Sequence, residues 1–265
     1  MRPLRLVLAA SLLCLGGCAA HPGTPPQGSA PAPHASGEPP HWAYDGEEGP
    51  SHWGDLDPAF ATCSLGHLQS PIDIPAASIK PEHLDPIRFD YSEAPLRVSD
   101  NGHTEMIAYP PGSTIRVGSA EYALQQIHFH RPSEEMVDGQ PFAMVAHFVH
   151  QKKGGGLAVV AVLFQEGADN PALARIFDHL PAAPGKEEAL AGVAVDASAL
   201  LPPSKSYFTF EGSLTTPPCS EGVTWFVLRT PVTASVGQIS AFARHYPHNV
   251  RPVQPVGGRQ IRASQ

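Results

Sequence analysis

The sequence predicts one mainly β domain with a few short helices, and three observations support this prediction. Five segments between residues 113 and 232 are rich in β-branched and aromatic residues and are bounded by Gly, Pro or Lys. The stretch KKGGG at 152–156 separates two of them and is typical of a hairpin, so we expect those strands to be antiparallel. From residue 41 onward the composition is globular, without a repeat or a second linker, so residues 41–265 are expected to form a single domain.

The N-terminus is typical of an export signal. Arg2 and Arg5 give it a basic start, and the apolar run at 6–15 is too short to span a bilayer. The sequence LGGC at 15–18 is similar to the lipobox of bacterial lipoproteins, in which the cysteine is lipidated; cleavage after Ala20 is the alternative. We therefore expect a signal peptide at 1–18 and a periplasmic protein whose contact with a membrane is a lipid on Cys18.

Residues 19–40 consist largely of Pro, Ala, Gly, Ser and His, without apolar periodicity. Such a segment cannot bury enough apolar surface to offset its ordering entropy, so it is predicted to be a disordered linker. The formal net charge of −8 argues against nucleic acid and anionic lipid as partners. Beyond the signal only Cys63 and Cys219 remain, and in an oxidising compartment such a pair indicates a disulfide; two unrelated buried thiols are the alternative.

The predicted strands lie at 113–130, 142–151, 156–164, 206–214 and 223–232. Two segments favour helices. At 170–180, Asn170 can cap the helix and Pro171 takes a first-turn position where proline is tolerated. The second candidate helix is at 235–246.

Two histidines, His128 and His130, stand two residues apart in an apolar strand, so both rings point to the same face. A zinc enzyme needs a third protein ligand and an open fourth position. In the strand at 142–151, His147 shares its face with valines at 145 and 149, whereas His150 faces the other side and is expected to be structural. His147 completes the site only if the two strands pair. The spacing alone also fits histidines that bind no metal and form hydrogen bonds with nearby groups.

Several motifs occur together in one order: QSPIDI at 69–74, NGH at 101–103, HFHRPSEE at 128–135, AHFVH at 146–150 and SLTTPPC at 213–219. This ordered set, within 41–255, resembles the alpha-class carbonic anhydrases. The resemblance implies a large, twisted, mostly antiparallel sheet with peripheral short helices. It also implies a Zn²⁺ cofactor, reversible hydration of carbon dioxide to bicarbonate and a proton, and inhibition by sulfonamides and anions.

The resemblance also assigns roles to residues. It implies zinc ligands at His128, His130 and His147, with the first two held by Gln126 and the backbone of Asn249. It pairs Cys63 with Cys219, as in exported relatives.

In the implied mechanism, Thr215 accepts a hydrogen bond from zinc-bound hydroxide and donates its own proton to Glu134. His103 exports the released proton through waters held by Tyr44 and Asn101. The residues expected around carbon dioxide are Val149, Val159, Leu214, Val223 and Trp225, with Thr216 on the polar side.

The sequence departs from the family pattern at two positions. The family usually has Glu where this chain has Val145, and that carboxylate takes the second N–H of the third histidine. Since loss of such a partner typically weakens metal binding 10–100-fold, we expect weaker zinc binding, with His147 held by water or a backbone carbonyl. Met106 replaces a polar residue of the cleft and is expected to affect the proton relay. The alternatives to an enzyme are a non-catalytic binding module of this fold and a zinc-buffering lipoprotein.

Overall fold

The computed structural model describes residues 40–185 and 187–265. The predicted signal peptide, Cys18 and the predicted linker up to residue 39 lie outside the described residues. Among the residues that are described, no helix combines the length and the apolar character needed to cross a membrane.

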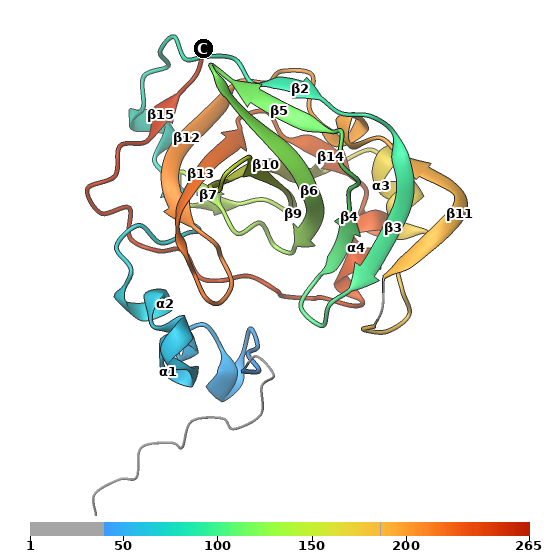
Figure 1. Cartoon of the computed structure of the whole chain (residues 1–265), viewed down its shortest axis with the longest axis horizontal. Helices are drawn as coiled ribbons and strands as arrows, with labels where there is room; N and C mark the ends of the chain where they lie inside the picture. Colours follow the sequence, from blue (N-terminus) through green and yellow to red (C-terminus); the bar gives the residue numbers. More distant parts are fainter. Residues whose placement is uncertain (1–39, 186) are drawn as a thin grey trace, which may run out of the picture. The chain divides into compact units, whose positions relative to one another are not determined.

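A twisted sheet of twelve strands dominates the described part of the chain (Figure 1). Its main path runs in the order β11 (Glu188–Val195), β3 (Ala94–Asp100), β4 (Glu105–Ala108), β6 (Ala120–His130), β9 (Met144–Lys152), β10 (Leu157–Glu166), β13 (Glu221–Leu228), β12 (Tyr207–Ser213) and β15 (Arg262–Ala263). Off this path, β14 (Val232–Ala234) pairs with β10, and β2 (Arg88–Asp90) pairs with β5 (Thr114–Val117), which pairs with β6.

Most of these strand pairs are antiparallel, and the two parallel ones join β10 to β13 and to β14. A separate small sheet consists of β1 (Asp73–Ile74), β7 (Met136–Val137) and β8 (Gln140–Pro141). The predicted fold class, a large and mostly antiparallel sheet, is therefore confirmed.

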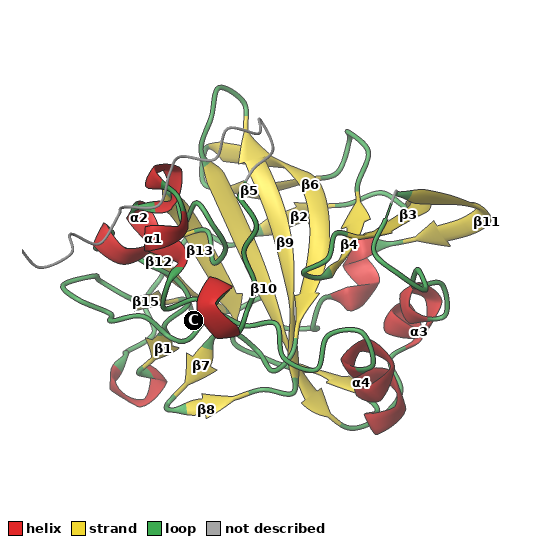
Figure 2. Cartoon of the chain, turned by 90° about the horizontal axis from the view of Figure 1, so that it is seen from below, coloured by secondary structure: helices red, strands yellow, loops and turns green. Residues whose placement is uncertain are grey.

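The helices are short and lie around the sheet (Figure 2). They are α1 (Trp53–Leu56), α2 (Thr62–Leu65), α3 (Pro171–Phe177) and α4 (Val236–Ala243), with 3₁₀ turns η1 (Gly46–Glu48), η2 (Pro58–Phe60), η3 (Ala76–Ser78) and η4 (Ala197–Leu200). Both predicted helices are present. Asn170 caps α3 by accepting two backbone N–H groups, and Ser235 and Gln238 form a reciprocal capping box at the start of α4.

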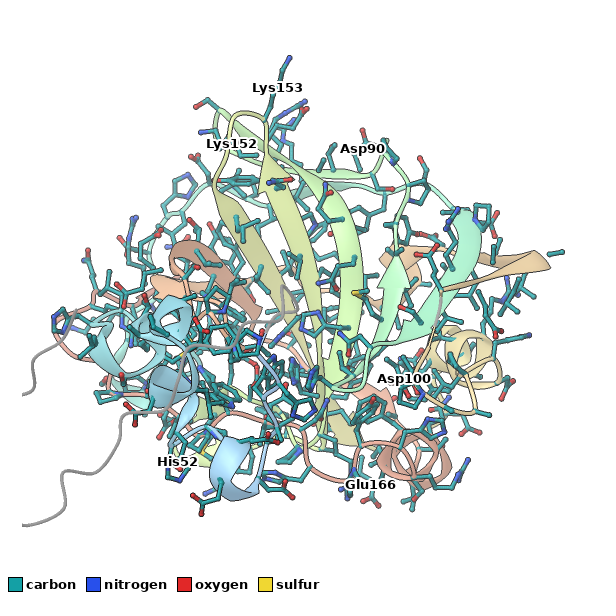
Figure 3. All side chains as sticks on the ribbon, turned by 60° about the horizontal axis from the view of Figure 1, so that its bottom comes forward. His52, Asp90, Asp100, Lys152, Lys153 and Glu166 are labelled. Atoms are coloured by element: carbon teal, nitrogen blue, oxygen red, sulfur yellow. A yellow bond between two sulfur atoms is a disulfide. The ribbon has the colours of Figure 1, made fainter. Side chains whose placement is uncertain are left out.

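The predicted hairpin joins β9 to β10, with Lys152 and Lys153 at its tip (Figure 3). Gly154, Gly155 and Gly156 all have positive φ angles, a conformation that residues with a Cβ rarely adopt. These three glycines therefore allow the tight reversal that makes the two strands neighbours.

The two faces of the sheet contact different apolar clusters. On β9 and β10, Phe148 and Val160 belong to the larger cluster, which includes the buried apolar residues of α3 and α4. Val145 and Val159 belong to the second cluster, on the opposite face, together with Trp225. Because side chains alternate along a strand, His147 lies on the face of this second cluster. The site is built there.

Candidate metal centre

Three imidazole rings meet on this face of the sheet. The antiparallel pairing of β6 with β9 sets His128 directly opposite His147, and His130 follows two residues along β6. The ring centroids are 4.9 Å apart for His128 and His130, 5.2 Å for His128 and His147, and 4.8 Å for His130 and His147. The pairing that the sequence interpretation had to assume is therefore present.

Each ring has one nitrogen held by an acceptor of the protein. Nδ1 of His128 is 2.9 Å from Oε1 of Gln126, and Nδ1 of His130 is 2.7 Å from the backbone oxygen of Asn249. These contacts place Gln126 and Asn249 where the sequence interpretation expects them. They leave Nε2 of both rings available for a metal.

The third ring is held by a carboxylate that the sequence analysis did not assign. Nε2 of His147 lies 3.1 and 3.2 Å from the two carboxylate oxygens of Glu135, and both side chains are at most 1% exposed. The expectation that water or a backbone carbonyl replaces the carboxylate missing at Val145 is therefore wrong. Val145 itself is fully buried in the apolar cluster beside His147. The sequence signal for Glu135 was the second acid of the pair at 134–135.

The three histidines fit a divalent metal ion. Their available ligand atoms all lie within 4.8 Å of one another. Nε2 of His130 is buried and has no hydrogen-bond partner among the described residues, which is unfavourable unless a ligand is bound there. Two buried acids, Glu134 and Glu135, adjoin the rings, and a cation would compensate their charge. Three nitrogen ligands are typical of catalytic zinc sites.

The environment keeps two of the rings neutral, as metal binding requires. Burial lowers the pKa of His128 and His130 well below the usual value, and the neighbouring rings of the group add to this effect. Burial also acts to lower the pKa of His147, but the carboxylates of Glu135 and Glu134 together outweigh it, so this pKa is raised.

Glu134 lies beside the free nitrogens of the group. Its Oε2 is 3.5 Å from Nε2 of His130 and 3.9 Å from Nδ1 of His147, while its Oε1 accepts the backbone N–H of Arg251 at 2.9 Å. Burial raises the pKa of Glu134 to about 7, against the lowering influence of His147, the Arg251 N–H and the Thr215 hydroxyl. Thr215, itself buried, lies near this carboxylate, whose Oε2 is buried without a hydrogen-bond partner among the described residues.

An apolar wall flanks the histidines. The Trp225 ring is 5.0 Å from the ring of His147. The five apolar residues predicted around the substrate all belong to the second apolar cluster: Val149, Val159, Leu214, Val223 and Trp225. The wall can therefore hold a small uncharged molecule next to the rings without a charged group.

A cavity of about 120 Å³ leads to the histidines, and its lining joins the predicted polar residues to two of the rings. It is lined by Trp42, Tyr44, Asn101, His103, Thr104, Met106, Gln126, His128, His130 and Thr216. Thr216 and Met106 thus lie on its wall, as expected. The hydroxyl of Tyr44 is buried without a hydrogen-bond partner in the described chain.

His103 lies flat on Trp42, with ring centroids 3.6 Å apart and an angle of 9° between the planes. The pKa of His103 is lowered, mainly by burial and also by His41, and the opposing influence of Asp100 is smaller. Asn101 accepts the backbone N–H groups of His103 and Thr104, so this asparagine holds the turn that presents His103 to the cavity. The role of Trp42 was not foreseen from the sequence.

The predicted disulfide between Cys63 and Cys219 is present. It lies in a third cluster with Trp53 and Phe60, and it attaches this N-terminal segment to the loop that follows Thr215. The buried Arg251 holds the same N-terminal segment from another part of the chain, because its guanidinium donates to the backbone oxygens of Cys63 and Ser70 and to the side chain of Gln69.

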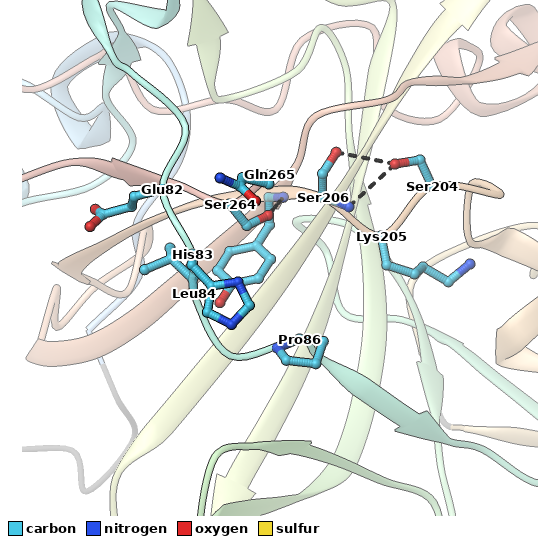
Figure 4. Close-up of a pocket in the computed structure, with 10 residues that line it drawn as sticks. Glu82, His83, Leu84, Pro86, Ser204, Lys205, Ser206, Ser264 and Gln265 are labelled. Atoms are coloured by element: carbon cyan, nitrogen blue, oxygen red, sulfur yellow. Dashed lines mark hydrogen bonds between the residues drawn. The ribbon is translucent and has the colours of Figure 1, made fainter.

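Two other features contain histidines but lie away from the triad. His150, on the opposite face of β9, is buried, and its Nε2 lies 2.7 Å from the Tyr91 hydroxyl, in keeping with a structural role. A hollow of about 360 Å³ beside β15 includes His83 and Lys205 (Figure 4). It shares no lining residue with the cavity at the metal centre.

A second acidic group lies behind the cavity. Glu105 neighbours Met106 on β4 and therefore points to the other face of the sheet. Its Oε1 is 2.8 Å from Nδ1 of His245, and Tyr246 donates its hydroxyl proton to Asp100 next to it. Burial raises the pKa of Glu105 to about 8, and the charge of Asp100 adds to this effect.

Comparison with known proteins agrees with this geometry. The family model described as eukaryotic-type carbonic anhydrase matches residues 48–265. The chain belongs to the alpha carbonic anhydrase family. It is 45% identical over 223 residues to a carbonic anhydrase of Pectobacterium carotovorum, covering 83% of this chain and 90% of that protein. It is 42% identical over 224 residues to one of Nostoc sp., covering 83% and 85% of the two chains.

A solved structure of the same family is also similar. It is the complex of the alpha carbonic anhydrase of Thermovibrio ammonificans with the inhibitor sulfanilamide. The TM-score is 0.82 and the identity 39%, and the match covers 85% of this chain and all of that one. This chain is thus an enzyme of the carbonic anhydrase type.

Proposed function

We propose that this protein binds one Zn²⁺ at His128, His130 and His147 and catalyses the reversible hydration of carbon dioxide to bicarbonate and a proton. The main support for this proposal is that the three rings converge on one point. Each ring is anchored through one nitrogen, and the ligand atoms of the three rings lie within 4.8 Å of one another. Zinc bound there supplies Lewis-acid chemistry that makes water a nucleophile near neutral pH.

The neighbouring residues then orient the reactants. The Thr215 hydroxyl donates a hydrogen bond to Glu134. The threonine oxygen can then accept a hydrogen bond from the attacking water. A lone pair of that water is thereby directed toward the substrate. The apolar wall around Trp225 and Val149 holds carbon dioxide, which has no charge to pair with, while Thr216 lies on the polar side.

The reaction releases a proton that must leave the site. His103 is the group in the cavity best suited to carry it, because imidazole titrates near neutral pH. Tyr44 and Asn101 line the same cavity and would hold the waters between His103 and the reacting centre. Stacking on Trp42 keeps the His103 ring at the cavity wall.

The place of action is also part of the proposal. The basic and apolar N-terminus with Cys18 supports export to the periplasm and attachment to a membrane by a lipid. Sulfonamides and small anions are expected to inhibit by occupying the metal position, since a family member with 39% identity binds sulfanilamide.

Stopped-flow measurement of carbon dioxide hydration by the purified protein tests the function, together with the number of zinc ions per chain. We expect one zinc, hydration that a sulfonamide abolishes, and loss of activity in Thr215→Val with the zinc retained. A folded protein that holds one zinc but does not hydrate carbon dioxide would be a binding module instead. Several zinc ions per chain would indicate a zinc buffer.

A further inference from the structure

The carboxylate next to His147 comes from an unusual place. Glu135 follows β6 and directly precedes β7, whereas the resemblance described in the sequence analysis implies this group on the strand of the histidine itself, at the position of Val145. In this chain Val145 is fully buried among apolar residues, and it shares the face of β9 with His147. A carboxylate from a different element therefore reaches the same ring.

The backbone around Glu135 is firmly held. The Ser133 hydroxyl donates to the backbone oxygen of Glu135 at 2.6 Å and accepts the N–H of Phe142 at 2.8 Å. The N–H of Ser133 donates to the backbone oxygen of Phe142, and β7 pairs with β1 immediately after Glu135. With its backbone fixed on both sides and its side chain fully buried, Glu135 has little freedom to move away from the ring.

The three rings also differ in the charge of their acceptors. His128 and His130 contact an amide oxygen and a backbone oxygen, which are neutral, whereas His147 contacts a carboxylate. A carboxylate on the outer N–H of a ligating histidine fixes its tautomer and makes the ring a stronger donor to the metal.

We propose that Glu135 is the positioning residue for His147, replacing the carboxylate that Val145 does not supply. Its carboxylate accepts the Nε2–H, which directs the Nδ1 lone pair toward the position shared with Nε2 of His128 and His130. The proposal rests on the zinc site described under the proposed function. It changes the expectation for zinc affinity, because the departure at Val145 is compensated within the same chain.

The rate of zinc release tests this proposal separately from catalysis. Zinc-loaded protein is mixed with an excess of a chromophoric chelator, and the absorbance of the zinc–chelator complex is followed. We expect Glu135→Gln, which keeps the shape but removes the charge, to release zinc about 10–100-fold faster than the wild type. Glu105→Gln is the matched control, since it removes another buried acid on the opposite face of the sheet, and its rate should stay at the wild-type value.

An exchange of the two positions completes the experiment. Glu135→Val should release zinc rapidly, and adding Val145→Glu to it should restore slow release, because the new carboxylate can contact the same N–H from β9. This rescue decides the question even if Glu135→Gln fails to fold. Release from folded Glu135→Gln at the wild-type rate would overturn the proposal, as would absence of rescue in a folded double variant.

Failure of the proposed function gives a different result. If the wild type binds no zinc, the function and the positioning role are both wrong. If the wild type binds one zinc and hydrates carbon dioxide, but Glu135→Gln releases the metal no faster, only the role of Glu135 is wrong.

Discussion

Reduction of the Cys63–Cys219 disulfide is the perturbation whose effect on stability the structure lets us estimate best. The two cysteines are 156 residues apart in sequence, so the bond closes a loop that includes most of the central sheet. In the chain-entropy model, a loop of this length stabilises the folded state by about 5 kcal/mol at 25 °C. Measured values are usually about 2–4 kcal/mol, because the reduced unfolded chain retains some structure.

For a domain of this size, about 1 kcal/mol corresponds to about 2–4 °C in melting temperature. We therefore expect reduction to lower the melting temperature by about 5–15 °C. The protein should remain folded at 25 °C, because the hydrogen bond from the Gln69 side chain to the backbone oxygen of Cys219 and those between Ser70 and Ser213 still join the two segments.

The assay is thermal unfolding of the zinc-free protein, with and without a phosphine reductant, and with alkylation to verify that both thiols are free. The variant Cys63→Ala with Cys219→Ala controls for other effects of the reductant, to which its melting temperature should not respond. Coincident unfolding curves for the oxidised and the fully reduced wild type would refute the reasoning, since they would mean that the loop constraint contributes nothing.

Three further predictions concern single residues. His103→Ala should lower carbon dioxide hydration about 10–100-fold in weakly buffered solution, and added imidazole should restore it; equal loss at every buffer concentration would contradict proton transfer by this residue. Val149→Phe should obstruct the apolar wall and lower hydration by up to about 100-fold while zinc content stays at one per chain; unchanged hydration would place the substrate elsewhere. Burial raises the pKa of Glu105 to about 8 in the folded protein, whereas in the unfolded chain the same carboxyl has a pKa near 4.5. The folded state is therefore progressively destabilised as the pH rises between those values. Glu105→Gln should therefore melt at a higher temperature than the wild type at pH 8 and at a similar one at pH 4, and a difference independent of pH would exclude this explanation.

The sequence alone determined the features that depend on near neighbours in the chain. The alternation of side chains placed His128 and His130 on one face and separated His147 from His150, because strand geometry repeats every two residues. Asn170 located the start of α3, because its side chain bonds to N–H groups only two and three residues away. The glycines at 154–156 predicted the hairpin by the same kind of local reasoning.

Tertiary structure alone decided how these pieces meet. The register that sets His147 opposite His128 depends on hydrogen bonds between two strands, and the sequence interpretation had to assume it. The stacking of His103 on Trp42 joins residues 61 positions apart, and no local pattern encodes it.

The carboxylate at His147 is the clearest example. From the sequence, the valine at position 145 predicted that the His147 ring has no acidic partner. Glu135, twelve residues before His147, nevertheless supplies one. A hydrogen bond requires only that donor and acceptor meet in space at the right distance. The sequence therefore specifies which residue types are present, and the folded backbone determines which of them form hydrogen bonds with one another.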